Sequence, residues 1–141
     1  MKGSLHQIVR VAHLIDPAVN AAAGEVQSVG LDCQGYDEAL FIVTCGVITA
    51  TGDVLVHLEE SDDNGVADAY ADIALAIIPD TVLTVALDQT EHLIHVDLAK
   101  RKRWIRVCHD VDDDAATFGI IALLGSPKYL PITQVNAVIS V

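Results

Sequence analysis

Turn signals recur at short intervals along most of this sequence, and they confine the elements between them to short runs. They fall at 35–38, 50–53, 62–65, 78–81, 88–91, 100–103, 110–114 and 125–128. The runs between them are rich in Val, Ile, Leu and Thr. Short β-prone segments at regular spacing are typical of an all-β sandwich or barrel.

Hydrophobic periodicity supports strands. The segments 53–60 and 92–100 alternate with a period of two, which is a strand signature and not a helical one. The segments 39–48 and 117–125 are apolar on both faces, so each is either a central strand or one whose second face meets a partner. The residues expected on the core face are Val54, Val56, Leu58, Ile94, Val96, Leu98, Phe118, Ile120, Ala122 and Leu124.

The predicted fold is therefore all-β, an antiparallel β-sandwich or β-barrel of jelly-roll or immunoglobulin-like type. Residues 1–24 are expected to form an N-terminal arm, extended or a short helix, and 25–128 the body. The tail 129–141 is β-prone and should pack on the body or on a neighbouring subunit. The alanine-rich stretch 67–80 is ambiguous between a helix and one short strand with a loop.

Charge and hydropathy exclude several classes of protein. The formal net charge of −12 argues against nucleic-acid binding, which depends on Lys and Arg neutralising phosphates. No apolar run approaches the roughly 18 residues of a membrane span, and Arg10 and His13 interrupt the N-terminal apolar stretch, unlike a signal peptide. A hydrophobic fraction of 52% and a mean hydropathy of +0.42 indicate burial against other subunits, as a dimer or trimer.

The cysteines do not form a disulfide framework. Cys33, Cys45 and Cys108 are odd in number and widely spaced, and each lies in an apolar, strand-like context. Buried, reduced thiols are expected, which fits a protein assembled in the cytoplasm.

The acidic stretch 58–70 combines carboxylates with Asn64 and Gly65, which is the strongest short hairpin signal. Residue 71 is Ala where a calcium-binding EF-hand loop needs its bidentate Glu, so an EF-hand is rejected. A hairpin tip with an acidic rim, a weak cation site and a catalytic site remain open, in falling order of preference. No metal is expected, and the weak candidate ligands are Asp62, Asp63, Asp112, Asp113 and Asp114.

The segment 100–106 holds five of the eight basic residues. It is expected to contact identical subunits or a larger assembly, or to pair with the acidic segment 110–114 across an intervening strand. Trp104 alone is too little aromatic surface for a nucleic-acid stacking platform. The predicted interaction residues are Lys100, Arg101, Lys102, Arg103, Trp104 and Arg106.

No catalytic set is expected. His92 and His95 should face opposite sides of a strand, and so should Cys108 and His109, while His57 and His109 are each expected to stand alone as metal ligands. The nucleophile-elbow, P-loop and dinucleotide-binding motifs are missing from the sequence. These patterns predict a protein that is not an enzyme and carries no cofactor.

Several short motifs, taken together over about 8–128, resemble those of small virion proteins of tailed bacteriophages and prophages. The family patterns are D-L-x-G-Y-x-S-A, V-G-x-I-T-D, L-x-E-S-D-D-G, K-R-Y-V-R-V and G-x-P. Here the Leu–Asp order of the first motif is inverted, Trp104 replaces Tyr in the fourth, and 67–80 and 129–141 depart from the pattern. The matching residues are Leu31, Asp32, Gly35, Tyr36, Ala39, Gly46, Ile48, Thr49, Leu58, Glu60, Ser61, Asp62, Asp63, Arg103, Trp104, Ile105, Arg106, Val107, Gly125 and Pro127.

The resemblance implies a capsid decoration (cement) or head-fibre-base protein that oligomerises and binds the major capsid protein. It would be located on the capsid surface of the virion after assembly in the host cytoplasm, without nucleic-acid or membrane partners. A neck or tail component, or a carbohydrate- or cation-binding β-sandwich module, are the alternatives.

Overall fold

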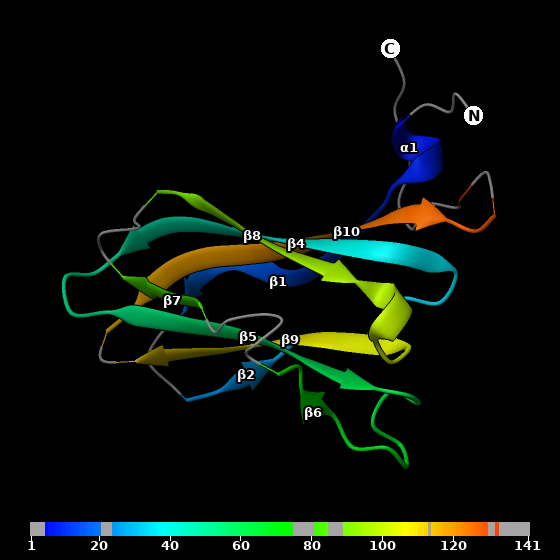
Figure 1. The fold of residues 1–141 in the computed structure, drawn as a ribbon. Helices are drawn as coiled ribbons and strands as arrows, with labels where there is room; N and C mark the ends of the chain where they lie inside the picture. The colour runs from blue at the N-terminus through cyan, green and yellow to red at the C-terminus, as the bar shows by residue number, and fades with distance from the viewer. Residues whose placement is uncertain are drawn as a thin grey trace.

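The computed structural model describes residues 5–20, 24–74, 81–84, 89–112, 114–129 and 132. In these residues two antiparallel sheets face each other and enclose the core (Figure 1). The predicted all-β class and the sandwich architecture are confirmed. Most of 78–81, where a turn was expected, and most of the predicted β-prone tail 129–141 lie outside the described residues.

Sheet A has the strand order β1-β10-β4-β8. Its strands are β1 (Arg10–Asn20), β10 (Ala116–Pro127), β4 (Tyr36–Ile48) and β8 (Glu91–Asp97). The two segments that are apolar on both faces are β4 and β10, and they form the central pair of the sheet. This agrees with the first of the two alternatives, that each is a central strand.

Sheet B is built on the pair β5–β9, with short strands at both sides. Its strands are β5 (Asp53–Ser61), β9 (Trp104–Asp112), β2 (Val26–Gln27), β3 (Leu31–Asp32), β6 (Ala71–Asp72) and β7 (Thr81–Thr84). β2 and β3 pair with β9, whereas β6 and β7 pair with β5. The 3-10 helix η2 (Leu98–Lys100) carries the chain from sheet A to sheet B.

Residues 1–24, expected as an arm, include an integral strand of the sandwich. The helix α1 (Leu5–Ile8) is short, and it projects from the sheet A side in Figure 1. β1 then follows β10 from Arg10, opposite Leu124, to Asn20, opposite Ala116. The stretch 67–80 contributes the short strand β6 and a loop, and 75–80 lies outside the described residues.

The core lies between the sheets and follows the predicted alternation. Every residue expected on the core face is buried, from Val54 and Val56 on β5 to Leu124 on β10. Phe41 and Phe118 are the largest side chains that are fully buried, and they fill the space between the layers. The three cysteines are free and buried, also as expected.

A search of the described helices finds none that is long and apolar enough to cross a membrane.

The core predicts a large difference between two apolar side chains on neighbouring strands of sheet A. Phe41 on β4 is 0% exposed, whereas Leu93 on β8 is 63% exposed. We expect Phe41→Ala to lower the free energy of unfolding by about 3–5 kcal/mol because it leaves a cavity, and Leu93→Ala to change it by about 0.5 kcal/mol or less. Urea denaturation measures both, and equal losses would contradict this assignment of the core.

Candidate functional site

The basic segment at the start of β9 lies where three distant parts of the chain meet. Trp104 pairs with Asp32 of β3 on one side and with Ser61 of β5 on the other. The motifs around 31–36, 58–63 and 102–107, which carry most of the resemblance, are therefore neighbours in space. We call this region the motif corner.

Ion pairs within the chain engage the cations of the motif corner. They join Arg101 to Glu60 (3.4 Å), Lys102 to Asp68 (2.7 Å), Arg103 to Asp32 (2.6 Å) and Arg106 to Glu59. Arg103 makes two parallel hydrogen bonds to Asp32, the geometry that makes such pairs strong. Pairing with the acidic segment 110–114 was wrong, because that segment begins within the last residues of β9, at the opposite end of the strand from the basic segment. Lys100 is exposed, and the interaction role of the six predicted residues stays a prediction.

These pairs set the protonation of their carboxylates. The hydrogen bond from Arg103 holds the pKa of Asp32 below its usual 3.8, and Lys102 lowers the pKa of Asp68 in the same way. The guanidinium of Arg106 also lies 4.2 Å from the ring centroid of Tyr70, within the range of a cation–π contact. The motif corner is therefore held together by electrostatic contacts within the chain.

The loop of residues 62–70 after β5, which we call the acidic loop, has more internal hydrogen bonds than a simple hairpin tip with a solvated rim would have. Asn64 and Gly65 both have positive φ, 62° and 78°, as the predicted turn requires. However, β5 ends at Ser61 and its partner β6 begins only at Ala71, so a long loop joins them. The carboxylate of Asp63 organises this loop by accepting hydrogen bonds from three backbone N–H groups, those of Val66, Ala67 and Asp68.

Asp62 and Asp63, which the sequence placed together on an acidic rim, therefore differ. Asp63 holds the loop, and these backbone hydrogen bonds lower its pKa, while Asp62 is exposed. Among the other weak candidates, Asp114 accepts a hydrogen bond from the N–H of Ala115, and Asp113 lies outside the described residues. Asp112 is exposed at the end of β9.

The outer face of sheet A is apolar across all four strands. Strand register places Val11, Leu123 and Leu40 side by side in one row, and Ile121, Ile42 and Leu93 in the next. Val11 is 48% and Leu93 63% exposed. We call these six residues the apolar face.

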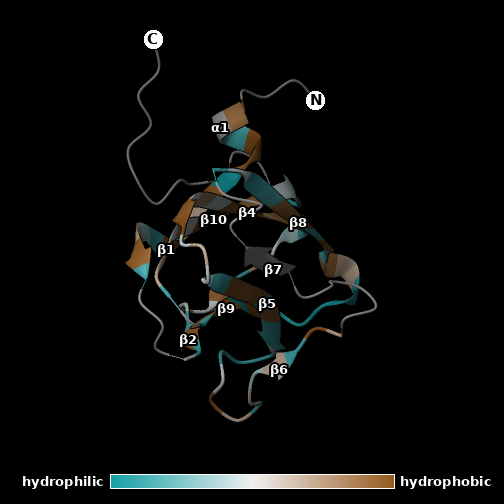
Figure 2. Cartoon of the chain, turned by 90° about the vertical axis from the view of Figure 1, so that its left-hand side faces the viewer, coloured by the Kyte–Doolittle hydropathy of each residue, from teal (hydrophilic) through white to brown (hydrophobic). Residues whose placement is uncertain are grey.

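Acidic residues border the apolar face. Glu38 and Asp97 are paired across β4 and β8 at one end, and Glu91 lies opposite Thr44 at the other. The outward positions of the described sheet A strands include His13 and His95 but no Lys or Arg. Figure 2 shows sheet A as the upper layer, with hydrophobic colour on β1 and β10.

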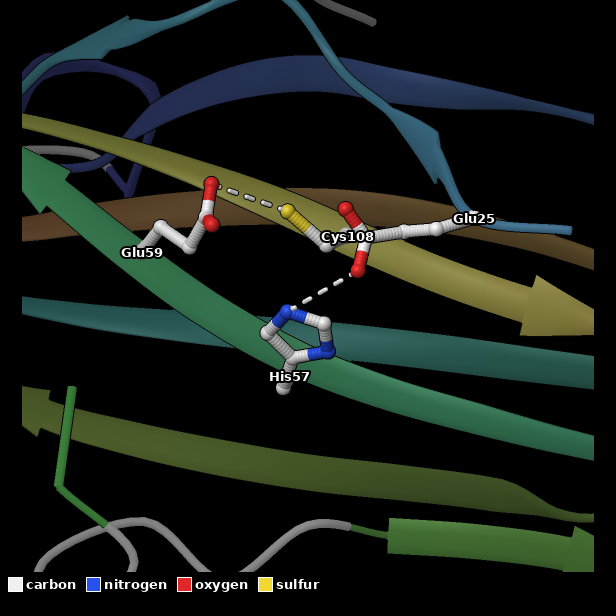
Figure 3. Close-up of side chains that lie close together, drawn as sticks. All are labelled: Glu25, His57, Glu59 and Cys108. Carbon is white, nitrogen blue, oxygen red and sulfur yellow. Dashed lines mark hydrogen bonds and ion pairs between the residues drawn. The ribbon is translucent and has the colours of Figure 1, made fainter. Parts of the chain in front are cut away.

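The outer face of sheet B is polar and brings together a mixed set of side chains. Glu25 comes from the segment before β2, His57 and Glu59 from β5, and Cys108 from β9, and all four converge in Figure 3. One ligand atom of each lies within 4.8 Å of the others. A nitrogen, a sulfur and two carboxylates at this spacing form a set of the kind that binds zinc. We call these residues the Glu–His–Cys cluster.

The expectation that His57 stands alone was wrong. Register places it directly opposite Cys108, and its Nε2 lies 3.3 Å from Asp72 Oδ1 and 3.7 Å from Glu25 Oε2. The thiol of Cys108 donates to Glu59 Oε2 over 3.2 Å, and burial together with that carboxylate raises its pKa. The pairing of β5 with β9 was not available from periodicity, although alternation with Val56 and Leu58 placed His57 on the outward face.

The other histidines follow the predicted geometry. His92 and His95 lie on opposite faces of β8, and His109 points inward while Cys108 points outward. The ring of His109 packs edge-on against Phe118 at 4.8 Å, and burial lowers its pKa. His109 is thus a neutral core residue.

No protein-family model matches the sequence, and no curated protein matches it. The fold is similar to a chain in a solved structure titled "Structure of infectious bursal disease virus Gt strain", with a TM-score of 0.48 and 9% sequence identity. The match covers 87% of this chain and 35% of the viral chain, so this protein spans about a third of the length of the viral chain. A likeness of this strength carries no argument about function.

The motif corner predicts that acid destabilises the fold. Asp32, Glu59, Asp63 and Asp68 all have lowered pKa values. A carboxyl whose pKa is lower in the folded state contributes stability that is complete above about pH 5 and is lost as the pH falls through the folded pKa. We expect the urea concentration at the midpoint of unfolding to decrease as the pH is lowered below about 5. The decrease should be less steep in Asp32→Asn. An identical pH profile in the variant would contradict a role for the Arg103–Asp32 pair.

The acidic loop predicts different outcomes for two adjacent, chemically identical substitutions. Asp63→Asn should lower the thermal midpoint because an amide leaves one acceptor oxygen for three N–H donors. Asp62→Asn removes the same charge from an exposed side chain and should change the stability by about 0.5 kcal/mol or less. Differential scanning calorimetry measures both, and equal midpoints would show that Asp63 does not hold the loop.

Proposed function

We propose that this protein is a non-enzymatic virion structural protein of a tailed bacteriophage, which decorates the capsid and stabilises it by binding the major capsid protein. Its site of action would be the capsid surface, reached after assembly in the host cytoplasm. The motif resemblance suggests this role. Support from the structure comes from the motif corner, where the matched segments form one connected unit.

The observation that carries the proposal is the apolar face. Its side chains lie on two central and two outer strands, so the face extends across the whole sheet. Contiguous exposed apolar surface on a folded domain marks an interaction site. Sheet faces are also rigid, which reduces the entropy lost on binding.

We propose that the major capsid protein, rather than a second copy, occupies the apolar face. Glu38, Glu91 and Asp97 border it, and a second copy would bring the same acids into apposition. A partner with basic residues around an apolar patch would complement both the face and the net charge of −12. Binding across adjacent capsid subunits would add buried apolar area that heat must remove, which is the physical basis of a cement role.

Self-association into a dimer or trimer is a separate part of the proposal. Native mass spectrometry of the purified protein, in the absence of capsid, measures the number of chains in the particle and so tests self-association directly. A monomer at all concentrations would remove the homo-oligomer and leave capsid binding to be tested by itself.

The apolar face predicts the outcome of a binding experiment with two matched variants. Leu93→Asp places a carboxylate in the face, and Val66→Asp places one on the acidic loop, where Val66 is 85% exposed. The probe is heads assembled from the major capsid protein of the same genome, without the decorating protein. We expect Leu93→Asp to weaken the affinity for the heads, measured by co-sedimentation, at least about 100-fold, because an unpaired charge is costly to bury. Val66→Asp should bind with the affinity of the wild-type protein.

Three outcomes would overturn the proposal. The first is a genome that encodes this chain without any major capsid protein. The second is equal binding of both variants, which would remove the apolar face from the interface. The third is heads that withstand heat equally with and without the bound protein, which would remove the cement role.

A further inference from the structure

We propose that the Glu–His–Cys cluster on the outer face of sheet B is a binding site for a zinc-class divalent metal ion, with Glu25, His57, Glu59 and Cys108 as ligands. This site is independent of the apolar face, which lies on the other sheet.

The spacing of the donor atoms fits a tetrahedral ion. Bonds of about 2.0–2.3 Å imply ligand-to-ligand separations of about 3.3–3.8 Å in such a site. One pair is already at that spacing, since His57 Nε2 lies 3.7 Å from Glu25 Oε2, and Cys108 Sγ is slightly closer to Glu59 Oε2, at 3.2 Å. All four donors lie within 4.8 Å of one another, so small side-chain rotations complete the set.

The backbone fixes the three central ligands. His57 and Cys108 are directly opposite on β5 and β9, and Glu59 follows His57 on the same face of its strand. Gln27 of β2 also pairs with Cys108, so the chain leading from Glu25 is held beside it. Ligands on paired strands are placed more precisely than ligands on loops.

Charge around the cluster favours a cation. Asp72 and Glu25 both point at Nε2 of His57, although a neutral imidazole nitrogen can donate only one hydrogen. Three carboxylates, including Glu59, therefore surround the site, and Arg106 is the cation paired with one of them. A divalent ion in contact with Nε2 would balance the remaining negative charge.

Arg106 does not block the ion. It contacts Oε2 of Glu59, which also accepts from the thiol of Cys108, and loss of the thiol proton would free a lone pair of this carboxylate for the metal while Arg106 stays bound. The side chains of His57 and Glu59 are 16% and 14% exposed, and Glu25 covers them from the solvent side at 42%. Cys108 lies beneath at 0% exposure. The site is thus largely enclosed, and its most exposed ligand, Glu25, is held by a hydrogen bond from Gln27 Nε2 to its Oε1 (2.8 Å).

Metal binding would replace the thiol proton of Cys108, so that a metal–sulfur bond forms, the S–H bond breaks and one proton passes to solvent. The competing interpretation is a hydrogen-bonded cluster that binds no metal. It predicts no spectroscopic change when metal is added.

Cobalt(II) chloride added to the reduced, full-length protein distinguishes the two interpretations. We expect saturation at one ion per chain, a near-ultraviolet thiolate-to-cobalt charge-transfer band, and loss of that band when zinc chloride displaces the cobalt. Cys108→Ser should abolish the band, whereas Cys45→Ser, a buried thiol in the other sheet, should retain it. Absence of the band in the wild-type protein, or an unchanged band in Cys108→Ser, would overturn the proposal.

Two further variants keep the test informative if Cys108→Ser folds poorly. Glu25→Gln alters a half-exposed side chain, and His57→Asn removes the nitrogen ligand; each should weaken cobalt binding by more than about tenfold. Zinc should raise the thermal midpoint of the wild-type protein, and less so that of each variant. A cobalt affinity and a zinc-induced thermal shift equal to those of the wild-type protein in both variants would exclude Glu25 and His57 as ligands.

Discussion

The antiparallel pairing of β5 with β9 is the constraint on which the rest of the structure depends. It runs from Asp53 opposite Asp112 to Ser61 opposite Trp104. Because side chains alternate along a strand, a slip of one residue would turn Val54 and Val56 out of the core. The same slip would separate His57 from Cys108 and Glu59 from Arg106. The hydrophobic core therefore fixes the register, and the register assembles both the motif corner and the Glu–His–Cys cluster.

The two sheets share one core but present opposite chemistry to their surroundings. Sheet A exposes apolar rows such as Leu40 beside Leu123, whereas the outer face of sheet B carries ion pairs and the thiol cluster. Surface ion pairs contribute little stability individually. Those of the motif corner act together, however, because Arg103 joins β3 to β9 and Lys102 joins the acidic loop to the start of β9. The ion pairs of sheet B thus lie within the chain, whereas sheet A presents an apolar outer face.

Periodicity predicted the class of fold and the core face because burial imposes a period of two on each strand. It placed Phe118 and Leu124 inside, and it identified β4 and β10 as central strands or strands with a second apolar contact. It could not predict which strands pair, because pairing depends on contacts between distant segments. For that reason β1 was taken for an arm, and His57 was taken to stand alone. The role of Asp63 was missed because a rim acid and a loop-organising acid have the same sequence signature.

The acidic character of the chain has different consequences at different places. Carboxylates of the motif corner, such as Asp32, are neutralised by guanidinium groups and serve the fold. Glu91 and Asp97 border the apolar face, whose outward positions on the described strands hold no Lys or Arg, and under our proposal these acids would disfavour a second copy and favour a basic partner. Glu25 and Asp72 converge on one imidazole nitrogen, an arrangement that a cation completes. A net charge alone would not distinguish these three arrangements, whereas strand pairing shows which of these carboxylates are neighbours.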